Sequence, residues 1–497
     1  MPESRSLLID GQFAQGGAEP LKVLNPTSGE VIAVVECAAE ADIDRAVEVG
    51  ARRFDEGVWS KRPISERARI LHKFADLIEG ALEQLYQLEP LNNGRPIRET
   101  RAQIARLPEW YRYNAALLLA DRASVVPMPG PYHSYTERSP LGVVGILSSF
   151  NHPLMITSKS LAPALATGNS VVLKPSELTP LTALVLGELA LEAGIPDGVL
   201  NVVPGLGAVA GARLAAHPQV AKITFTGGTA AGRAVSRACA ERFAKCTLEL
   251  GGSSPVVVFA DSPLQEAVRG AAFSAFIGAG QTCIAGRRFI VHESVYKDFV
   301  DELCGVARSL RIGDPALLET QLGPMISHVA RERVIEKVHA AESEGVEVRH
   351  GGIAAHVDDS PGGFFIEPTV CAGPNQEFRL AREEIFGPVA FVAPFRDEAE
   401  AVSMANDSVY GLGAALWTRD VARAHRVASE IKCGIVWVND HHRLDPSSPW
   451  GGAGESGIGR EGGWESFHEF THTKAITIRT APEPVDWYGG QRLERLN

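Results

Sequence analysis

The sequence predicts an α/β fold with parallel sheets, and three observations carry the prediction. Short apolar runs alternate with helical segments of about ten to fifteen residues, as in βαβ units. The alternation starts again after Gly252, which indicates a second α/β domain. Two further segments, outside both series, have the pattern of strands that leave the main sheets.

The first series covers residues 141–227. Buried apolar runs predict strands at 141–147, 170–174, 198–203 and 221–227, and helices are expected at 159–168, 182–194 and near 207–216. Strands joined by helices of this length form a doubly wound, Rossmann-like nucleotide-binding domain.

The second series begins with "SPVVVFA" and continues through "RRFIVHESVYKDFVDELCGVARSL", "GPVAFVAPF" and "GIVWVND". The stretch 121–140 fits a β-hairpin that leaves the first sheet, and 471–480 is a late strand with no partner beside it in sequence. Two such strands indicate an intersubunit sheet, although an ordinary edge hairpin fits the pattern equally well.

Composition argues against several classes of protein. The chain has 497 residues and a net charge of −12 without basic blocks, so nucleic acid is not an expected partner. No apolar run approaches the ~18 residues of a membrane span. The N-terminus lacks a basic region followed by a long apolar run, so we expect no signal peptide and a cytoplasmic protein. Seven widely spaced cysteines without a CxxC pair predict neither disulfides nor a metal site.

Three residues are candidates for covalent chemistry. Cys283 lies in "GAGQTCIAG" among small residues; most cysteines are inert packing, but a thiolate in such a place is a strong nucleophile. Glu249 lies between two leucines, where apolar surroundings raise the pKa of a carboxyl group and suit a general base. Asn151 follows the first strand, where its amide could donate to an oxyanion.

Two strand ends are candidates for holding a dinucleotide. "FTGGTAAG" starts at Phe225 and places Gly227 and Gly228 at the beginning of a helix, whose N–H groups suit a pyrophosphate. A tight turn between strand and helix explains these glycines equally well. Lys174 and Glu177 in "LKPSE" could bond ribose hydroxyls, and the alternative is a solvated turn.

The order of these motifs resembles the aldehyde dehydrogenase superfamily, in its NAD(P)-dependent, non-acylating branch. The resemblance runs nearly end to end, through "LLIDGQF", "LNPTSGEVIA", "NNGRP", "SPLGVVGI", "NHPL", "PALATGNSVVLKPSE", "FTGGTAAGR", "LELGGSSP", "GQTC", "EEIFGPV", "NDSVYGL" and "SGIGREGG".

The resemblance implies roles for the matching residues. Cys283 matches the nucleophile, Glu249 the base that hydrolyses a thioester, and Asn151 the oxyanion-hole asparagine, joined by the Cys283 amide. Glu461 matches a second glutamate, assigned to a proton relay. The cofactor residues are Lys174, Glu177, Phe225, Gly227, Gly228, Glu384 and Phe386. The substrate pocket is expected at His152, Ile156, Thr282, Ile284, Arg443, Leu444 and Trp450.

The same resemblance divides the chain. Residues 1–120 and 141–251 are expected to form the NAD-binding domain and 252–455 the catalytic domain. Segments 121–140 and 471–485 are the expected oligomerisation strands of a homodimer or homotetramer. NAD is expected rather than NADP, because the charge of Glu177 disfavours a 2′-phosphate.

Three positions depart from the family pattern. Gly228 stands where many members have serine, and Trp450 where phenylalanine is common. Ser160 occupies the position of a lysine thought to belong to the proton relay, with Lys159 shifted by one residue, which puts the relay through Glu461 in doubt.

The predicted pocket is mainly apolar, so a medium-sized apolar or aromatic aldehyde is the expected substrate. Arg443 could instead pair with a substrate carboxylate, which would make the substrate a semialdehyde acid. The alternative is that His441, His442 and Arg443 shape a surface loop. A cofactor-independent cysteine esterase is a remote further reading.

Overall fold

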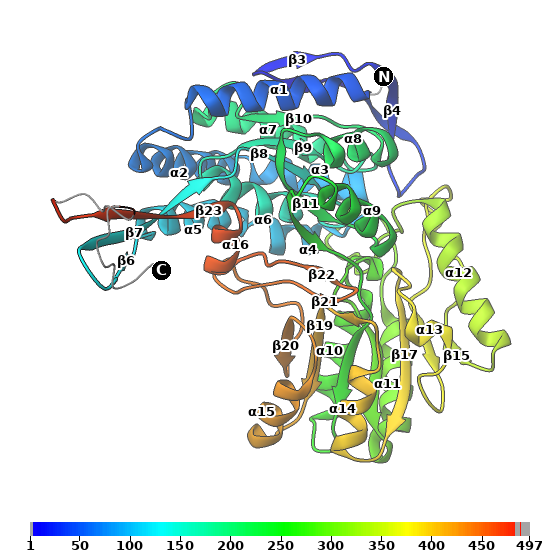
Figure 1. The fold of residues 1–497 in the computed structure, drawn as a ribbon. Helices are drawn as coiled ribbons and strands as arrows, with labels where there is room; N and C mark the ends of the chain where they lie inside the picture. Colours follow the sequence, from blue (N-terminus) through cyan, green and yellow to red (C-terminus); the bar gives the residue numbers. More distant parts are fainter. Residues whose placement is uncertain (1–2, 483–487, 489–497) are drawn as a thin grey trace.

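The computed structural model describes residues 3–482 and 488. Figure 1 shows two α/β halves, one above that contains α1 to α9 and one below that contains α10 to α15, each built around one large sheet. In the described part of the chain, no helix combines the length and the apolar character needed to cross a bilayer.

The first sheet has eight strands in the order β22-β12-β11-β8-β9-β10-β2-β3. Their bounds are β2 Leu7–Ile9, β3 Gln12–Ala14, β8 Val143–Leu147, β9 Ser170–Lys174, β10 Leu200–Val202, β11 Val220–Thr226, β12 Lys245–Glu249 and β22 Gly457–Ile458. The five strands from β10 to β12 are parallel, as predicted from the βαβ series.

Alternate side chains of these parallel strands enter two cores. Val143 and Val172 pack with helices α1, α8 and α9, whereas Val144 and Val171 pack with α2, α5, α6 and α7. These helices are α1 Glu40–Glu56, α2 Ile64–Gly80, α5 Leu107–Ala120, α6 Pro153–Ala166, α7 Leu181–Ala193, α8 Ala212–Ala216 and α9 Thr229–Ala240; α3 Leu82–Asn93 and α4 Ile97–Ile104 connect α2 to α5. Burial on both faces explains why the strands are apolar throughout.

The register brings the ends of four strands to one edge. Leu147 of β8 pairs with Lys174 of β9 and with Phe225 of β11, and Thr226 pairs with Glu249 of β12. The predicted site residues that follow these strands therefore meet at the carboxyl edge of the sheet, where doubly wound folds bind ligands.

The second sheet has seven strands in the order β15-β16-β17-β14-β13-β19-β20, parallel except for β15. The strands are β13 Ser254–Val258, β14 Gly286–His292, β15 Glu347–His350, β16 Thr369–Ala372, β17 Val389–Phe395, β19 Gly413–Trp417 and β20 Ile435–Val438. The helices are α10 Leu264–Phe276, α11 Glu293–Ser309, α12 His328–Ser343, α13 Arg379–Arg382, α14 Glu398–Asn406 and α15 Val421–Glu430.

The chain returns to the first sheet after β20. Strand β21 Ala453–Gly454 pairs with β18 Tyr410–Gly411, and β22 pairs antiparallel with β12, with Gly457 opposite Glu249. Helix α16 Gly463–Glu469 then contacts α5 and α6. This return places residues from the end of the chain beside β12. A small sheet of β1 Glu3–Arg5, β5 Val31–Cys37 and β4 Ala18–Leu24 completes the N-terminal part.

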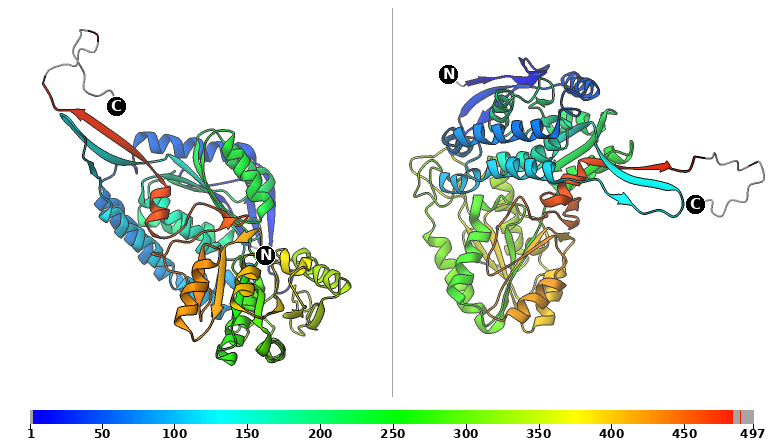
Figure 2. Two further views of the ribbon diagram at one scale, coloured as in Figure 1. Left: turned by 60° about the horizontal axis from the view of Figure 1, so that its bottom comes forward. Right: turned by 90° about the vertical axis from the view of Figure 1, so that its left-hand side faces the viewer.

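A separate three-stranded sheet projects from the molecule (Figure 2). The hairpin expected at 121–140 forms β6 Val125–Val126 and β7 Tyr132–Pro140, and the late strand is β23 Thr471–Arg479. β23 pairs antiparallel with β7 along its whole length, from Thr471 opposite Pro140 to Arg479 opposite Tyr132. The late strand thus has a partner in its own chain. Residues 483–485 of the predicted segment lie outside the described residues.

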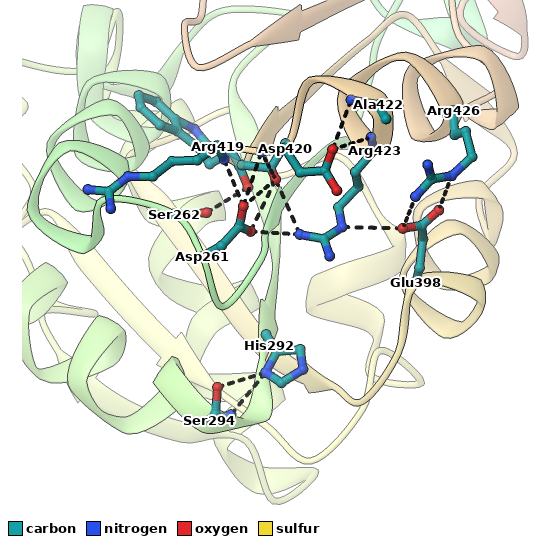
Figure 3. Close-up of polar contacts among 12 residues, drawn as sticks. Asp261, Ser262, His292, Ser294, Glu398, Arg419, Asp420, Ala422, Arg423 and Arg426 are labelled. Atoms are coloured by element: carbon teal, nitrogen blue, oxygen red, sulfur yellow. Dashed lines mark hydrogen bonds and ion pairs between the residues drawn. The ribbon is translucent and has the colours of Figure 1, made fainter.

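Polar contacts join the outer ends of three elements of the second half (Figure 3). Asp261, after β13, accepts hydrogen bonds from the Thr418 hydroxyl and the Arg419 backbone N–H at 2.9 Å and lies 2.7 Å from Arg423. Asp420 caps α15 by accepting from the N–H groups of Ala422 and Arg423. Since Asp261, Asp420 and Arg423 each have partners within the cluster, we interpret these contacts as structural.

Candidate active site

A cavity of about 650 Å³ lies between the two halves of the chain. Its wall includes Cys283, Glu249 and Asn151, the three residues predicted to carry covalent chemistry. All seven residues predicted for the substrate pocket also line it: His152, Ile156, Thr282, Ile284, Arg443, Leu444 and Trp450. The fold therefore brings together residues as far apart in the sequence as Asn151 and Trp450, which are about 300 positions apart.

The segment before Cys283 has an unusual backbone. Helix α10 ends at Phe276, and the next turn holds Gly278, Ala279 and Gly280 at φ values of 60°, 53° and 63°. A left-handed alanine is uncommon because its Cβ crowds the backbone. At Gly280 a Cβ would lie 2.2 Å from the Gly387 carbonyl oxygen, so only glycine fits there.

Two side chains hold this turn. Gln281 donates through Nε2 to the Gly278 carbonyl at 3.2 Å and accepts from the Ile326 backbone N–H at 2.9 Å. The Gly278 N–H donates to Glu99 on α4 at 3.0 Å. Burial raises the pKa of Glu99 to about 7, against the opposing effects of Arg95 and the Gly278 N–H. The contacts with Glu99 and with Ile326 are not foreseeable from local sequence, because these partners lie 179 and 45 positions away from Gly278 and Gln281.

Burial raises the pKa of the Cys283 thiol to about 12. The ammonium group of Lys159 opposes this effect by favouring the thiolate, and Glu249 adds to it. The backbone N–H of Cys283 also lies close enough to its own sulfur to favour the charged form. In the free protein the thiol is therefore neutral near pH 7 and needs a base to become a nucleophile.

Asn151 follows β8 and is buried at the start of α6. Its side-chain oxygen accepts a 2.7 Å hydrogen bond from the Ser149 hydroxyl. Because the oxygen is occupied, the Asn151 amide group is the end that remains for an acceptor in the cavity.

Glu249 is buried at the end of β12 and is held by one oxygen. Trp450 Nε1 donates to Oε2 at 2.8 Å, whereas Oε1 has no hydrogen-bond partner among the described residues. Burial, followed by the charge of Glu461, raises the pKa of Glu249 to about 8, with Lys159 and Trp450 opposing the rise. A carboxylate with this pKa and a free oxygen is suited to proton transfer near neutral pH.

Lys159 and Ser160 both contact Glu461. Its Nζ lies 2.7 Å from Glu461 Oε2, and the hydroxyl of Ser160 donates to Glu461 Oε1 at 3.2 Å. Burial works against the charged lysine, but Glu461 and then Glu249 outweigh it and raise the pKa of Lys159. The one-residue shift seen in the sequence thus keeps an ammonium group on Glu461.

The predicted dinucleotide residues lie along the same sheet edge. Lys174 is buried at the end of β9, and its Nζ lies 3.0 Å from Glu177. The Gly227 N–H already donates to the Glu249 carbonyl oxygen at 3.0 Å, so it has a partner. Gly228 precedes α9 and faces open space, since a Cβ there would meet no atom within 4 Å. Phe225 packs against Gly227, where a Cβ would lie 2.5 Å from the Phe225 ring.

Glu384 and Phe386 border this edge from the second half. Glu384 Oε1 accepts from the Gly252 N–H at 3.1 Å, and a Cβ on Gly251 would overlap the carboxylate. The Phe386 ring stands edge-on to Phe150 at 5.7 Å, with a left-handed backbone (φ 55°) at Phe386. No group of three or more metal-ligating side chains occurs among the residues described.

The loop after β20 differs from the predicted surface loop. The His441 ring is buried and stacks on Trp437 at 4.7 Å, and its Nδ1 lies 2.7 Å from that of His442. Burial lowers the pKa of His442 to about 3, so both rings are neutral at pH 7. Only Arg443 points outward, with 77% of its side chain exposed.

Comparison with known proteins gives one family. The sequence model of the aldehyde dehydrogenase family matches residues 13–476. Phenylacetaldehyde dehydrogenase of Pseudomonas fluorescens is 41% identical over 95% of both chains. Betaine aldehyde dehydrogenase of Bacillus subtilis is 38% identical over 98% of this chain and 99% of its own.

Solved structures agree. PnpE from Pseudomonas sp. WBC-3 matches with a TM-score of 0.95 and 40% identity, covering 98% of this chain and 99% of that chain. Betaine aldehyde dehydrogenase from Staphylococcus aureus, solved in complex with NAD+, matches with a TM-score of 0.96 and 35% identity, covering 98% of this chain and 97% of that chain.

Proposed function

The chain belongs to the aldehyde dehydrogenase family, and we propose that it oxidises an aldehyde to the carboxylic acid with NAD as hydride acceptor. One observation carries the proposal: Cys283, Asn151 and Glu249 line a single cavity that meets the carboxyl edge of the first sheet. A nucleophile, an amide donor and a base in one cavity are the groups that acyl chemistry requires.

The residues at the sheet edge fit a dinucleotide. Lys174 and Glu177 would bond the hydroxyls of an adenosine ribose, and the open space at Gly228 at the start of α9 would admit a pyrophosphate. Glu384 would hold the second ribose and Phe386 would lie beside the nicotinamide. The carboxylate of Glu177 favours NAD over NADP, because a 2′-phosphate would meet a like charge.

Cys283 is the proposed nucleophile. Lys159 favours its thiolate, and the free Oε1 of Glu249 is available to take the thiol proton. The thiolate adds to the aldehyde carbon, while the amide of Asn151 and the backbone N–H of Cys283 hold the oxyanion of the thiohemiacetal. Removal of one such donor costs about 3 kcal/mol of barrier.

Glu249 is the proposed base for the second half of the reaction. The chemistry that bound NAD supplies is acceptance of a hydride from the carbon attached to Cys283. The thiol proton that Glu249 took in the first step leaves the buried site by a proposed route through Glu461 and Lys159. The Glu249 carboxylate then removes a proton from the water that attacks the thioester. Hydrolysis frees the acid and leaves Cys283 as a thiolate, to which Glu249 returns the proton.

The wall near Cys283 favours an apolar or aromatic group of medium size next to the aldehyde. Ile156, Ile284 and Trp450 line the cavity there, and the volume of about 650 Å³ suits a small organic molecule. The projecting sheet of β6, β7 and β23 is the proposed contact in a homodimer or homotetramer. Its order is β23-β7-β6, so β23 and β6 are the edge strands of this sheet among the described residues.

Formation of NADH with a panel of aldehydes tests the proposal. The Cys283→Ala variant should lose aldehyde oxidation and keep NAD binding, measured by quenching of protein fluorescence. Oxidation that survives in this variant contradicts the assignment of the nucleophile. Ester hydrolysis with no NADH from any aldehyde would favour the cysteine esterase instead.

A further inference from the structure

Three arginines from three segments stand at the outer end of the substrate cavity. Arg98 lies on α4, Arg269 on α10 and Arg443 in the loop after β20, and all three both line the cavity and are exposed. The side chains of Glu249 and Asn151, deeper in the same cavity, are buried. Residues that belong to both the cavity and the surface mark its opening.

Among the described residues these arginines have only weak anionic partners: the charge of Arg98 acts on the neighbouring Glu99 without an ion pair, and Arg443 lies near Asp440. In the part of the chain that the structure describes, Arg98 and Arg269 form no ion pair and no side-chain hydrogen bond. Arg443 has one contact with Asp440, at 3.6 Å, and both groups are at least half exposed. Such a pair contributes little.

The other cationic side chains of the cavity have close partners of their own. The pairs are Arg95 with Glu89 at 2.7 Å, Lys159 with Glu461 at 2.7 Å, and Arg106 with Glu109 at 2.8 Å. Asp440, which also lines the cavity and is exposed, offsets part of the charge of the three arginines, and a surplus positive charge remains at the opening, in a chain whose net charge is −12. Local cationic charge on an acidic protein concentrates an anion at that place.

An apolar wall separates the opening from the nucleophile. On α10, Arg269, Ala272, Phe273 and Phe276 share one helix face along the cavity. The seven steps from Arg269 to Phe276 span about 10 Å of helix. A molecule with its carbonyl at Cys283 must therefore cross apolar surface before it reaches the arginines.

We propose that the preferred substrate is an aldehyde with a carboxylate at the end opposite the carbonyl, and that Arg98, Arg269 and Arg443 bind this carboxylate. An apolar chain or ring joins the two ends and fills the wall between them. Guanidinium groups suit this role because their forked N–H donors match a carboxylate. The inference rests on the proposed aldehyde oxidation. It further specifies that the end of the substrate opposite the aldehyde carries a negative charge. The sequence indicates only Arg443; the other two arginines come from the fold.

Matched pairs of aldehydes test it. The pairs are 6-oxohexanoate with hexanal and 4-formylbenzoate with 4-formylbenzamide, each assayed through NADH formation. We expect kcat/KM to be about tenfold or more higher for each carboxylate than for its uncharged partner. Raising NaCl from about 0.05 M to about 0.5 M should reduce this preference, since exposed charges are screened.

The variants Arg98→Gln and Arg269→Gln should each raise KM for the carboxylates about fivefold to tenfold, with kcat and the KM for hexanal unchanged. Arg333→Gln is the matched control, because Arg333 is an exposed arginine on α12 outside the cavity. The inference would be overturned if kcat/KM were equal within each pair of aldehydes, or if the variants raised KM for hexanal as much as KM for the carboxylates. Either result would leave the proposed aldehyde oxidation intact. Absence of oxidation with every aldehyde would overturn the proposed function, and this inference with it.

Discussion

Trp450 Nε1 donates a 2.8 Å hydrogen bond to Oε2 of Glu249, from a residue 201 positions later in the chain. The Lys159 ammonium lies over the Trp450 ring, with Nζ 4.6 Å from the ring centroid. The backbones of Trp450 and Glu461 form two hydrogen bonds with each other, at 2.6 and 2.7 Å. One side chain of the substrate wall thus contacts both the proposed base and its proton route. A phenylalanine, which lacks the N–H, could not hold the base in this way.

The Trp450→Phe variant should raise the pKa of Glu249 further above its usual range, because the indole N–H stabilises the carboxylate. We expect the pH midpoint of thioester hydrolysis to move upward and kcat near pH 7 to fall about fivefold to tenfold, with KM for hexanal little changed. Pre-steady-state kinetics across pH measures both. Trp437→Phe is the control, since its Nε1 donates to the Arg443 carbonyl instead. An unchanged midpoint would mean that the indole does not position the base.

The pH dependence of the wild type follows from Glu249. Its folded pKa of about 8 lies above the ordinary value of 4.5, so the base becomes active as pH rises through about 8. The same shift makes the stability of the fold depend on pH, because the folded state binds the Glu249 proton more tightly than the unfolded state does. This contribution to the free energy of unfolding is complete below about pH 4.5 and is lost as pH rises through about 8. Glu249→Gln should abolish hydrolysis and flatten the stability change between pH 6 and about 9. A hydrolysis rate independent of pH over that window would contradict the base assignment.

Lys159 should set the reactivity of Cys283 in the absence of substrate. Because its ammonium favours the thiolate, Lys159→Met should slow alkylation by iodoacetamide about tenfold at a fixed pH, whereas Lys159→Arg should retain most of the rate. Loss of Lys159 also leaves Glu461 buried without its partner, which is strongly destabilising. The double variant Lys159→Met, Glu461→Leu removes both charges. Its alkylation should be as slow as that of the single variant; wild-type reactivity would exclude the proposed effect.

Glu99 should act on the nucleophile through the backbone. The Glu99→Ala variant leaves the Gly278 N–H without its acceptor and loosens the left-handed turn before Cys283, so kcat should fall about tenfold while NAD affinity is unchanged. Glu99→Gln keeps an acceptor oxygen and should recover most of the rate. Equal losses in both variants would indicate that the charge, and not the hydrogen bond, is important.

The surface cluster around Asp261 should contribute to stability alone. Burial works against its carboxylate, but the Thr418 hydroxyl, the Arg419 N–H and Arg423 together lower the pKa of Asp261. Its stabilising effect is therefore present above its unfolded pKa and is lost as pH falls through the lower folded value. Asp261→Ala should reduce the free energy of unfolding by about 1–2 kcal/mol at pH 7, with no change in kcat. Thermal melts at pH 7 and about pH 3 measure this, and the difference between variant and wild type should be smaller in acid.

Local patterns in the sequence were sufficient for much of the fold. The strands expected at 170–174 and 221–227 are β9 and β11 within one residue, since continuous apolar runs between helices are typical of strands buried on both faces. The hairpin at 121–140 is also present. Strand β19, Gly413–Trp417, is not among the predicted strands, because its first three residues are glycine and alanine, which are uncommon in strands.

The sequence by itself determined the family, the two α/β halves and the residues that carry the proposed chemistry, because these depend on short motifs whose spacing the chain keeps. Only the tertiary structure decided how these residues meet. The return of β22 to β12 brings Trp450 to Glu249 and Glu461 to Lys159, and the packing of α4 and α10 around the cavity brings Arg98 and Arg269 to one opening. Such contacts depend on strand order and helix placement over hundreds of residues, and no local pattern records them.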